Sequence, residues 1–141
     1  EVYRNNMQTA YYNEARAKGI KVPIVGASDS HGTEDSYWFT WLSTIVFSQD
    51  NQLQSIIDAV KGFYSVAVER YPGENYRIYG PYRLVKYALF LLNEYFPLHD
   101  ALCYEEGRLM KDYICGDENA KEILKLMQGR TARLLERCFN G

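Results

Sequence analysis

The sequence predicts an α+β protein that is rich in helix, and three observations lead to this fold class. β-Branched residues gather in short runs within residues 1–70. Residues 71–141 instead show the apolar spacing that is typical of amphipathic helices. A Tyr-Pro-Gly-Glu-Asn turn over residues 71–75 separates the two patterns. We therefore expect an α/β-like region over residues 1–70 and a helical region over residues 71–141.

The first region is expected to open with a helix and a strand. Residues 1–18 contain neither proline nor glycine, and Gly19 is a typical helix stop. Residues 20–25 are rich in β-branched side chains and predict a short strand, with Pro23 near its start or at a sheet edge. A small, polar loop over residues 26–33 follows this strand.

Two more strands and a connecting helix complete this region. Residues 43–48 and 64–69 are both rich in β-branched residues and predict strands. Asp50 or Asn51 is placed to cap the helix between them, and Gly62 is placed to end it. The apolar face of this helix has the spacing i, i+3, i+4, i+7 and consists of Leu53, Ile56, Ile57 and Val60.

The second region is expected to be a bundle of four helices. The helices are predicted over residues 81–96, 99–113, 117–128 and 130–139. Pro81 suits the first turn of the first helix, Pro97 is expected to end it, and Asp117 is expected to cap the third. Because the connections are short, neighbouring helices should run antiparallel.

Composition excludes several classes of protein. The chain has 141 residues with a formal net charge of -2, and 47% of its residues are hydrophobic, so intrinsic disorder is not expected. The charge balance argues against a protein that holds nucleic acid mainly through phosphate contacts. No apolar run approaches the roughly 20 residues that a membrane-spanning helix needs, and we expect no membrane association.

The cysteines indicate a compartment. Cys103, Cys115 and Cys138 are odd in number and form no C-x-x-C pair. We expect buried free thiols in a reducing environment and therefore a cytoplasmic protein.

The loop over residues 26–33 holds the candidate metal ligands. Asp29 and His31 lie two residues apart directly after a predicted strand, where ligands collect in α/β folds. A carboxylate and a neutral imidazole suit Zn, Mn or Fe. In the alternative, Asp29 caps the turn and His31 is an ordinary surface residue. The chain has only two histidines, so a complete nitrogen-rich site would need ligands from elsewhere.

This loop and the segments after it resemble a known family. The resemblance rests on Val-Gly-Ala-Ser-Asp-Ser-His-Gly over residues 25–32, and on the short strand, helix and strand that follow in that order. Together they look like the last part of a polymerase and histidinol phosphatase (PHP) domain, over roughly residues 20–69. The resemblance implies a distorted β/α barrel whose strand ends hold divalent metals and hydrolyse phosphate esters.

The resemblance also implies that the chain is incomplete. Asp29 and His31 match the family's closing motif and would be metal ligands, whereas the early His-x-His pair of the family has no counterpart here. The expected fold is thus the incomplete C-terminal portion of a β/α, PHP-like barrel followed by a helical bundle. We expect a missing N-terminal part of the same protein to supply the other ligands, and this chain alone to be inactive.

Arg77 and Arg83 are candidate substrate-binding residues. They lie among tyrosines in the run Tyr-Arg-Ile-Tyr-Gly-Pro-Tyr-Arg over residues 76–83, which suits a phosphate or a sugar and base unit. The expected substrate is a phosphorylated small molecule or a nucleotide. The same residues would equally suit a solvated face whose tyrosines pack on the helices.

Two other candidate sites are weaker. A serine hydrolase at Ser28 or Ser30 is disfavoured because the loop lacks the second glycine of a nucleophile elbow. A carboxylate cluster of Glu105 and Glu106 with His99 and Asp100 nearby is also disfavoured, because His99 and Asp100 suit a helix start better than a metal site.

Two functional hypotheses remain open at this point. The first is the C-terminal portion of a divalent-metal-dependent phosphoesterase. The second is a helical binding or regulatory module without a catalytic role. If neighbouring strands are missing, the edges of the strands over residues 20–25 and 64–69 should favour self-association.

Overall fold

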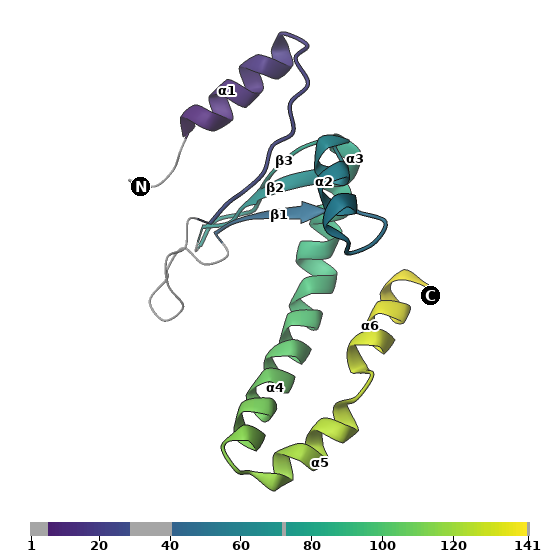
Figure 1. Cartoon of the computed structure of the whole chain (residues 1–141). Helices are drawn as coiled ribbons and strands as arrows, with labels where there is room; N and C mark the ends of the chain where they lie inside the picture. The colour runs from purple at the N-terminus through teal and green to yellow at the C-terminus, as the bar shows by residue number, and fades with distance from the viewer. Residues whose placement is uncertain (1–5, 29–40, 72, 141) are drawn as a thin grey trace. The chain divides into compact units, whose positions relative to one another are not determined.

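The computed structural model describes residues 6–28, 41–71 and 73–140 of the chain (Figure 1). It is an α+β protein, rich in helix, with a small antiparallel sheet, as the sequence predicts. The chain divides into two compact units, Glu1–Ala88 and Leu89–Gly141. The division falls inside α3 (Tyr82–Phe90), so the third strand and most of α3 belong to the N-terminal unit.

The sheet of the N-terminal unit has three strands. The strands are β1 (Leu42–Val46), β2 (Ser65–Glu69) and β3 (Arg77–Tyr79), arranged in the order β1-β2-β3. Both pairings are antiparallel, with Thr44 opposite Ala67 and Val68 opposite Ile78. The predictions of strands over residues 43–48 and 64–69 are confirmed to within two residues, whereas β3 was not predicted.

The central strand forms the core of this unit. Val66, Ala67 and Val68 are at most 5% exposed. β2 pairs with β1 over residues 65–69 and with β3 over residues 67–69. The prediction of an unpaired edge is therefore wrong for residues 67–69. β1 and β3 satisfy the hydrogen-bonding groups that would otherwise template self-association.

Helix α1 (Asn6–Ala17) ends as its sequence predicts. Gly19 adopts φ 75°, the amide of Ile20 donates to the carbonyl of Ala15 at 2.9 Å, and the amide of Gly19 donates to that of Arg16 at 3.0 Å. This pair of hydrogen bonds closes the helix in a Schellman motif.

The segment after α1 corrects a prediction. No strand is assigned over residues 20–28, although the side chains of residues 21–28 alternate between exposed and half-buried as in an extended chain. Pro23 lacks an amide donor, and the polar backbone groups of Gly26 bond to a side chain of β1 rather than to a strand backbone. The segment is extended, but it is not part of the sheet.

Helix α2 (Leu53–Lys61) connects β1 to β2, and Asp50 supports its start. A carboxylate oxygen of Asp50 accepts a hydrogen bond from the amide of Gln52 at 2.9 Å. A hydrogen bond from the Ser55 side chain, followed by that amide bond, lowers the pKa of the Asp50 carboxyl below its ordinary value of 3.8.

This lowered pKa gives a prediction for the pH dependence of the start of α2. Because the charged form is favoured in the folded chain, the contribution of Asp50 is present above pH 3.8 and is lost as the pH falls through the lowered pKa. We expect the amide signal of Gln52 to titrate in an NMR experiment with a midpoint below pH 3.8, and this titration to disappear in Asp50→Asn. The N-cap residue itself is Gln52, so a midpoint above that value would contradict the stabilisation of this turn by the Asp50 carboxylate.

The helix that begins at Tyr82 does not end at Pro97 as predicted. α3 is followed without a break by the π-helical turn η1 (Leu91–Tyr95) and by α4 (Phe96–Ile114). The amide of Phe96 donates to the carbonyl of Leu91, which is the wider bonding of a π turn. Pro97 then lies in the first turn of α4, directly after this π turn, and contributes no amide donor to the continuous helix.

The C-terminal unit is built on helices. After α4 come α5 (Glu118–Met127) and α6 (Arg130–Phe139). Asp117 caps α5 as predicted, because its carboxylate accepts the amide of Asn119 at 2.9 Å. Leu109 of α4 packs with Ala120 and Met127 of α5, and these three residues are at most 5% exposed.

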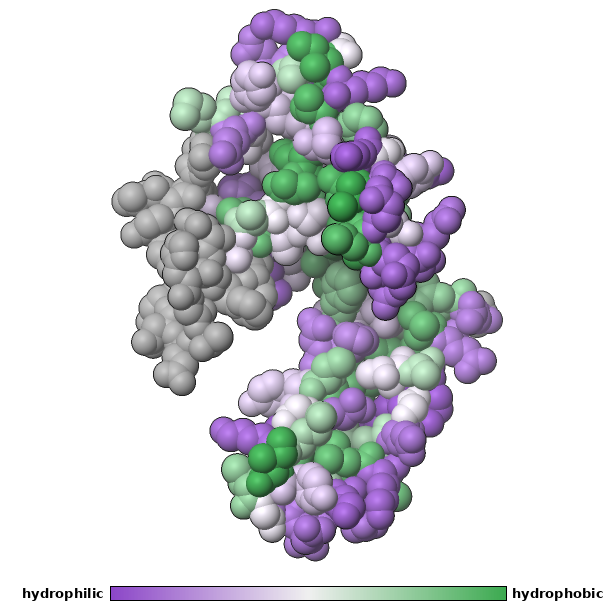
Figure 2. All heavy atoms as spheres, viewed as in Figure 1, coloured by the Kyte–Doolittle hydropathy of each residue, from purple (hydrophilic) through white to green (hydrophobic). Residues whose placement is uncertain are grey.

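Much apolar surface of this unit remains exposed. Figure 2 shows hydrophobic residues lying among hydrophilic ones on the visible face of these helices. The most exposed large side chains are Ile114 at 81%, Leu126 at 77% and Tyr104 at 75%.

The cysteines differ from their prediction in one respect. Cys103, Cys115 and Cys138 are free, but Cys103 and Cys115 are exposed and Cys138 is half-buried. The reason is that few residues of the C-terminal unit are buried, so this unit has only a small core in which a thiol could be buried. In the part of the chain that the structure describes, no helix is long and apolar enough to cross a membrane.

Candidate functional site

The two predicted metal ligands, Asp29 and His31, lie outside the described residues. The structure describes the chain up to Ser28, so the geometry that bears on this site is that of the segment leading to it.

A threonine side chain of β1 holds that segment on the sheet. The amide of Gly26 donates to Oγ1 of Thr44 at 2.9 Å, and the Thr44 hydroxyl donates to the carbonyl of Gly26 at 2.9 Å. One hydroxyl of β1 thus satisfies both backbone groups of one residue. The chain is fixed to β1 at Gly26, three residues before Asp29.

Gly26 is required at this point because the two backbones approach closely. A Cβ atom built on Gly26 would lie 2.4 Å from the carbonyl oxygen and 2.9 Å from the backbone nitrogen of Ser43. No side chain fits in that space, so only glycine permits the hydrogen bonds to Thr44.

Thr44→Val is expected to release this segment. Valine has a similar shape but no hydroxyl, so both backbone groups of Gly26 lose their partner, at a cost of about 2 kcal/mol in the free energy of unfolding. Urea unfolding followed by tryptophan fluorescence measures this loss, because Trp41 lies directly before β1 in the N-terminal unit. Thr44→Ser keeps the hydroxyl and should lose less than half as much; equal losses would contradict the role of the hydroxyl.

Arg77 is already paired with carboxylates. Its Nη2 lies 2.9 Å from Oε2 of Glu74, and its Nη1 lies 3.5 Å from Oε2 of Glu69. The hydroxyl of Tyr79 donates to the same oxygen of Glu69 at 3.2 Å. Burial, and then the charge of Glu69, raise the pKa of Tyr79 above its ordinary value of 10.0, which keeps this hydroxyl protonated as a donor.

Arg83 lies in a different setting from Arg77. It is exposed in the first turn of α3, and no described hydrogen bond or ion pair joins it to Arg77. The positive end of a helix favours an anion at this position. The described geometry therefore leaves the charge of Arg83 uncompensated, while that of Arg77 is shared by two carboxylates.

The weaker candidate at His99 forms only a local contact. Nδ1 of His99 lies 3.2 Å from Oδ1 of Asp100, and Sγ of Cys103 lies 3.7 Å from Nε2 of His99. Within residues 6–28, 41–71 and 73–140, no group of three or more His, Cys, Asp or Glu residues is arranged to hold a metal ion.

Sequence reasoning missed the roles of Thr44 and Glu69. Thr44 has only the β-branched signature of a strand residue, and its contact with Gly26 spans eighteen positions. Glu69 gathers Arg77 and Tyr79 because β2 and β3 pair, with Glu69 opposite Arg77. The contacts of Glu69 with Arg77 and Tyr79 could have been predicted only by first predicting β3 and its pairing with β2.

Comparison with known proteins adds no relative. The chain matches no protein-family model, and it has no match among curated proteins or among solved structures.

Proposed function

We propose that the chain is the C-terminal portion of a divalent-metal-dependent phosphoesterase, in which Asp29 and His31 are metal ligands. The observation that carries the proposal is the attachment of Gly26 to Thr44, directly before the Asp-x-His motif of residues 29–31. A metal site needs ligands on a segment whose position is fixed. The two hydrogen bonds provide such a fixed point, three residues before the first ligand.

Asp29 supplies a negative oxygen donor and His31 a neutral nitrogen donor in this proposal. This pair suits Zn, Mn or Fe, and the remaining ligands belong to a preceding part of the same protein. A bound divalent ion neutralises phosphate oxygens and lowers the pKa of water toward neutrality. The proposal includes the incomplete PHP-like barrel and a cytoplasmic location, and it makes the isolated chain inactive.

Arg83 and Arg77 are proposed to bind the substrate phosphate. Arg83 is exposed at the start of α3 and suits this role directly. Arg77 must exchange its contact with Glu74, which lies on the surface, before it can bind a phosphate oxygen. The proposed substrate is accordingly a phosphorylated small molecule or a nucleotide.

A second candidate function is a helical binding or regulatory module. The observation that favours it is the exposed apolar surface of the C-terminal unit, where Ile114, Leu126 and Tyr104 are each at least 75% exposed. Exposed apolar surface of this kind marks interaction sites when it is contiguous. This function needs no metal and no catalytic residue.

Metal retention by two forms of the protein distinguishes these functions. The 141-residue chain and a longer form that includes the preceding polypeptide are each incubated with Zn or Mn and passed through a desalting column. We expect only the longer form to retain metal and to hydrolyse p-nitrophenyl phosphate. A longer form that retains no metal and has no phosphatase activity would refute the phosphoesterase proposal and leave the binding module.

A further inference from the structure

A cavity of about 430 Å³ lies in the N-terminal unit. Its walls come from the second half of α1, the stretch after it, the turn that follows α2, and the two residues that precede α3. The side chains that line it include Tyr12, Arg16, Ile20, Lys21, Phe63 and Pro81. The volume falls within the usual range for small-molecule sites, about 300–1,000 Å³.

The charge of this cavity is positive. Arg16 and Lys21 line it, and the lining includes no acidic residue. Neither cation forms an ion pair with a carboxylate in the described part of the chain. The guanidinium of Arg16 lies 5.5 Å from the centre of the Tyr12 ring, and its charge remains available to an anion.

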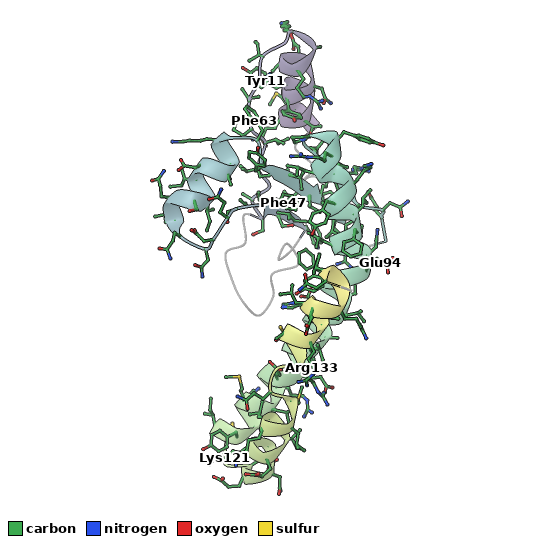
Figure 3. All side chains as sticks on the ribbon, turned by 90° about the vertical axis from the view of Figure 1, so that its right-hand side faces the viewer. Tyr11, Phe47, Phe63, Glu94, Lys121 and Arg133 are labelled. Atoms are coloured by element: carbon green, nitrogen blue, oxygen red, sulfur yellow. The ribbon has the colours of Figure 1, made fainter. Side chains whose placement is uncertain are left out.

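The remaining walls are apolar and include two rings. Tyr12 is only 8% exposed, and Phe63, which also lines the cavity, is half-buried. Figure 3 shows Phe63 beside α1, the helix that carries the labelled Tyr11. An apolar body with a flat face suits these walls, whereas a bare inorganic ion would leave them uncovered.

Phe63 adopts a backbone conformation that disfavours any residue but glycine. Its φ is 64°, and it is the only described residue other than glycine with a positive φ. The amide of Phe63 donates to the carbonyl of Val60 at 3.1 Å, and the amide of Tyr64 donates to that of Ala59 at 2.8 Å. This Schellman turn would hold glycine without strain, so the turn does not explain the phenyl ring. The position of the ring in the cavity wall supplies a reason for it.

We propose that this cavity binds a phosphate monoester of a small ring compound. The ring packs against Phe63 and Tyr12, and the phosphate binds Lys21 and Arg16. Two cations with no carboxylate partner among the described residues favour a doubly charged phosphate over a singly charged carboxylate. The inference does not rest on the proposed phosphoesterase, because no residue of the cavity is a proposed metal ligand and no metal is needed for its test.

Titration of the 141-residue chain with phenyl phosphate, followed by ¹H–¹⁵N NMR, tests the proposal. We expect saturable shifts at the amides of residues 16–22 and 63, and binding at least about tenfold tighter than that of phenol or of inorganic phosphate. Benzoate carries the same ring with a carboxylate in place of the phosphate. We expect it to bind more weakly than phenyl phosphate, and equal affinity would show that the cavity does not prefer phosphate. Equal affinity for phenol and phenyl phosphate, or shifts confined to exposed apolar residues such as Leu126, would overturn the proposal.

Matched variants separate binding from folding. Lys21→Gln is expected to weaken phenyl phosphate binding at least about fivefold, whereas Lys18→Gln, in a lysine that pairs with Glu14 and does not line the cavity, should not. Phe63→Gly is expected to weaken binding, while the strain that glycine relieves at a positive φ offsets part of the stability lost with the half-buried ring. If Phe63→Gly binds like the parent chain, the ring is not part of a binding site and the proposal is wrong.

Discussion

Replacing His31 by alanine is expected to reduce the metal retained by the longer form of the protein at least about 100-fold, and to remove its phosphatase activity. Removing one of a few ligands leaves the ion under-coordinated, and imidazole nitrogen is a ligand that water replaces poorly. Asp29→Ala should have a similar effect, because it removes the negative donor of the pair. Retained metal, measured by elemental analysis after desalting, is the primary measurement, and activity is the second.

The chain offers a matched control for this prediction. His99 is its only other histidine and lies in α4, where it contacts Asp100 and Cys103. His99→Ala should leave both metal retention and activity unchanged. If His31→Ala and His99→Ala lose metal equally, the loss reflects either general damage to the fold or non-specific metal binding by any histidine. If neither loses metal, the assignment of His31 as a ligand is wrong.

The features that the sequence predicted best depend on neighbouring residues alone. Gly19 ends α1 and Asp117 caps α5, because each depends on hydrogen bonds within a few positions of the chain. The strands β1 and β2 were also predicted, since runs of β-branched residues are typical of strands; in the structure β2 is buried and β1 is half-buried.

The features that were missed depend on distant partners. β3 has three residues, too few for a sequence pattern, and exists because β2 offers it an edge. The extended stretch over residues 20–28 has the composition of a strand, but its bonds go to a side chain of β1. Pro97 was expected to end a helix, and the preceding π turn instead makes room for it.

In the candidate site, too, the local features were predicted and the long-range contacts were missed. The chemical types of Asp29 and His31 and their spacing were read from the sequence, because a motif is local. The support at Thr44 was not, because it joins residues eighteen positions apart. Arg77 was identified as a basic residue among tyrosines, but its pairing with Glu69 follows from the register of β2 and β3.

Gly26→Ala is expected to have the second large effect. The added methyl group would meet the backbone of Ser43 at 2.4 Å, and a backbone cannot rotate away as a flexible side chain can. The segment must therefore leave Thr44, which breaks both hydrogen bonds and costs about 2–3 kcal/mol in the free energy of unfolding. In the longer form of the protein, retained metal should fall together with stability, since Asp29 follows three residues later.

Gly107→Ala is the matched control for this substitution. Gly107 lies inside α4 with open space where a Cβ would be, so alanine there should stabilise the chain by about 0.5–1 kcal/mol. A Gly26→Ala variant that unfolds at the parent urea midpoint would show that the contact with Ser43 yields without cost. If Gly26→Ala instead loses stability but the longer form still retains metal, the attachment of Gly26 to Thr44 is not needed for metal binding by Asp29 and His31. That result would remove the observation on which the proposed metal site depends.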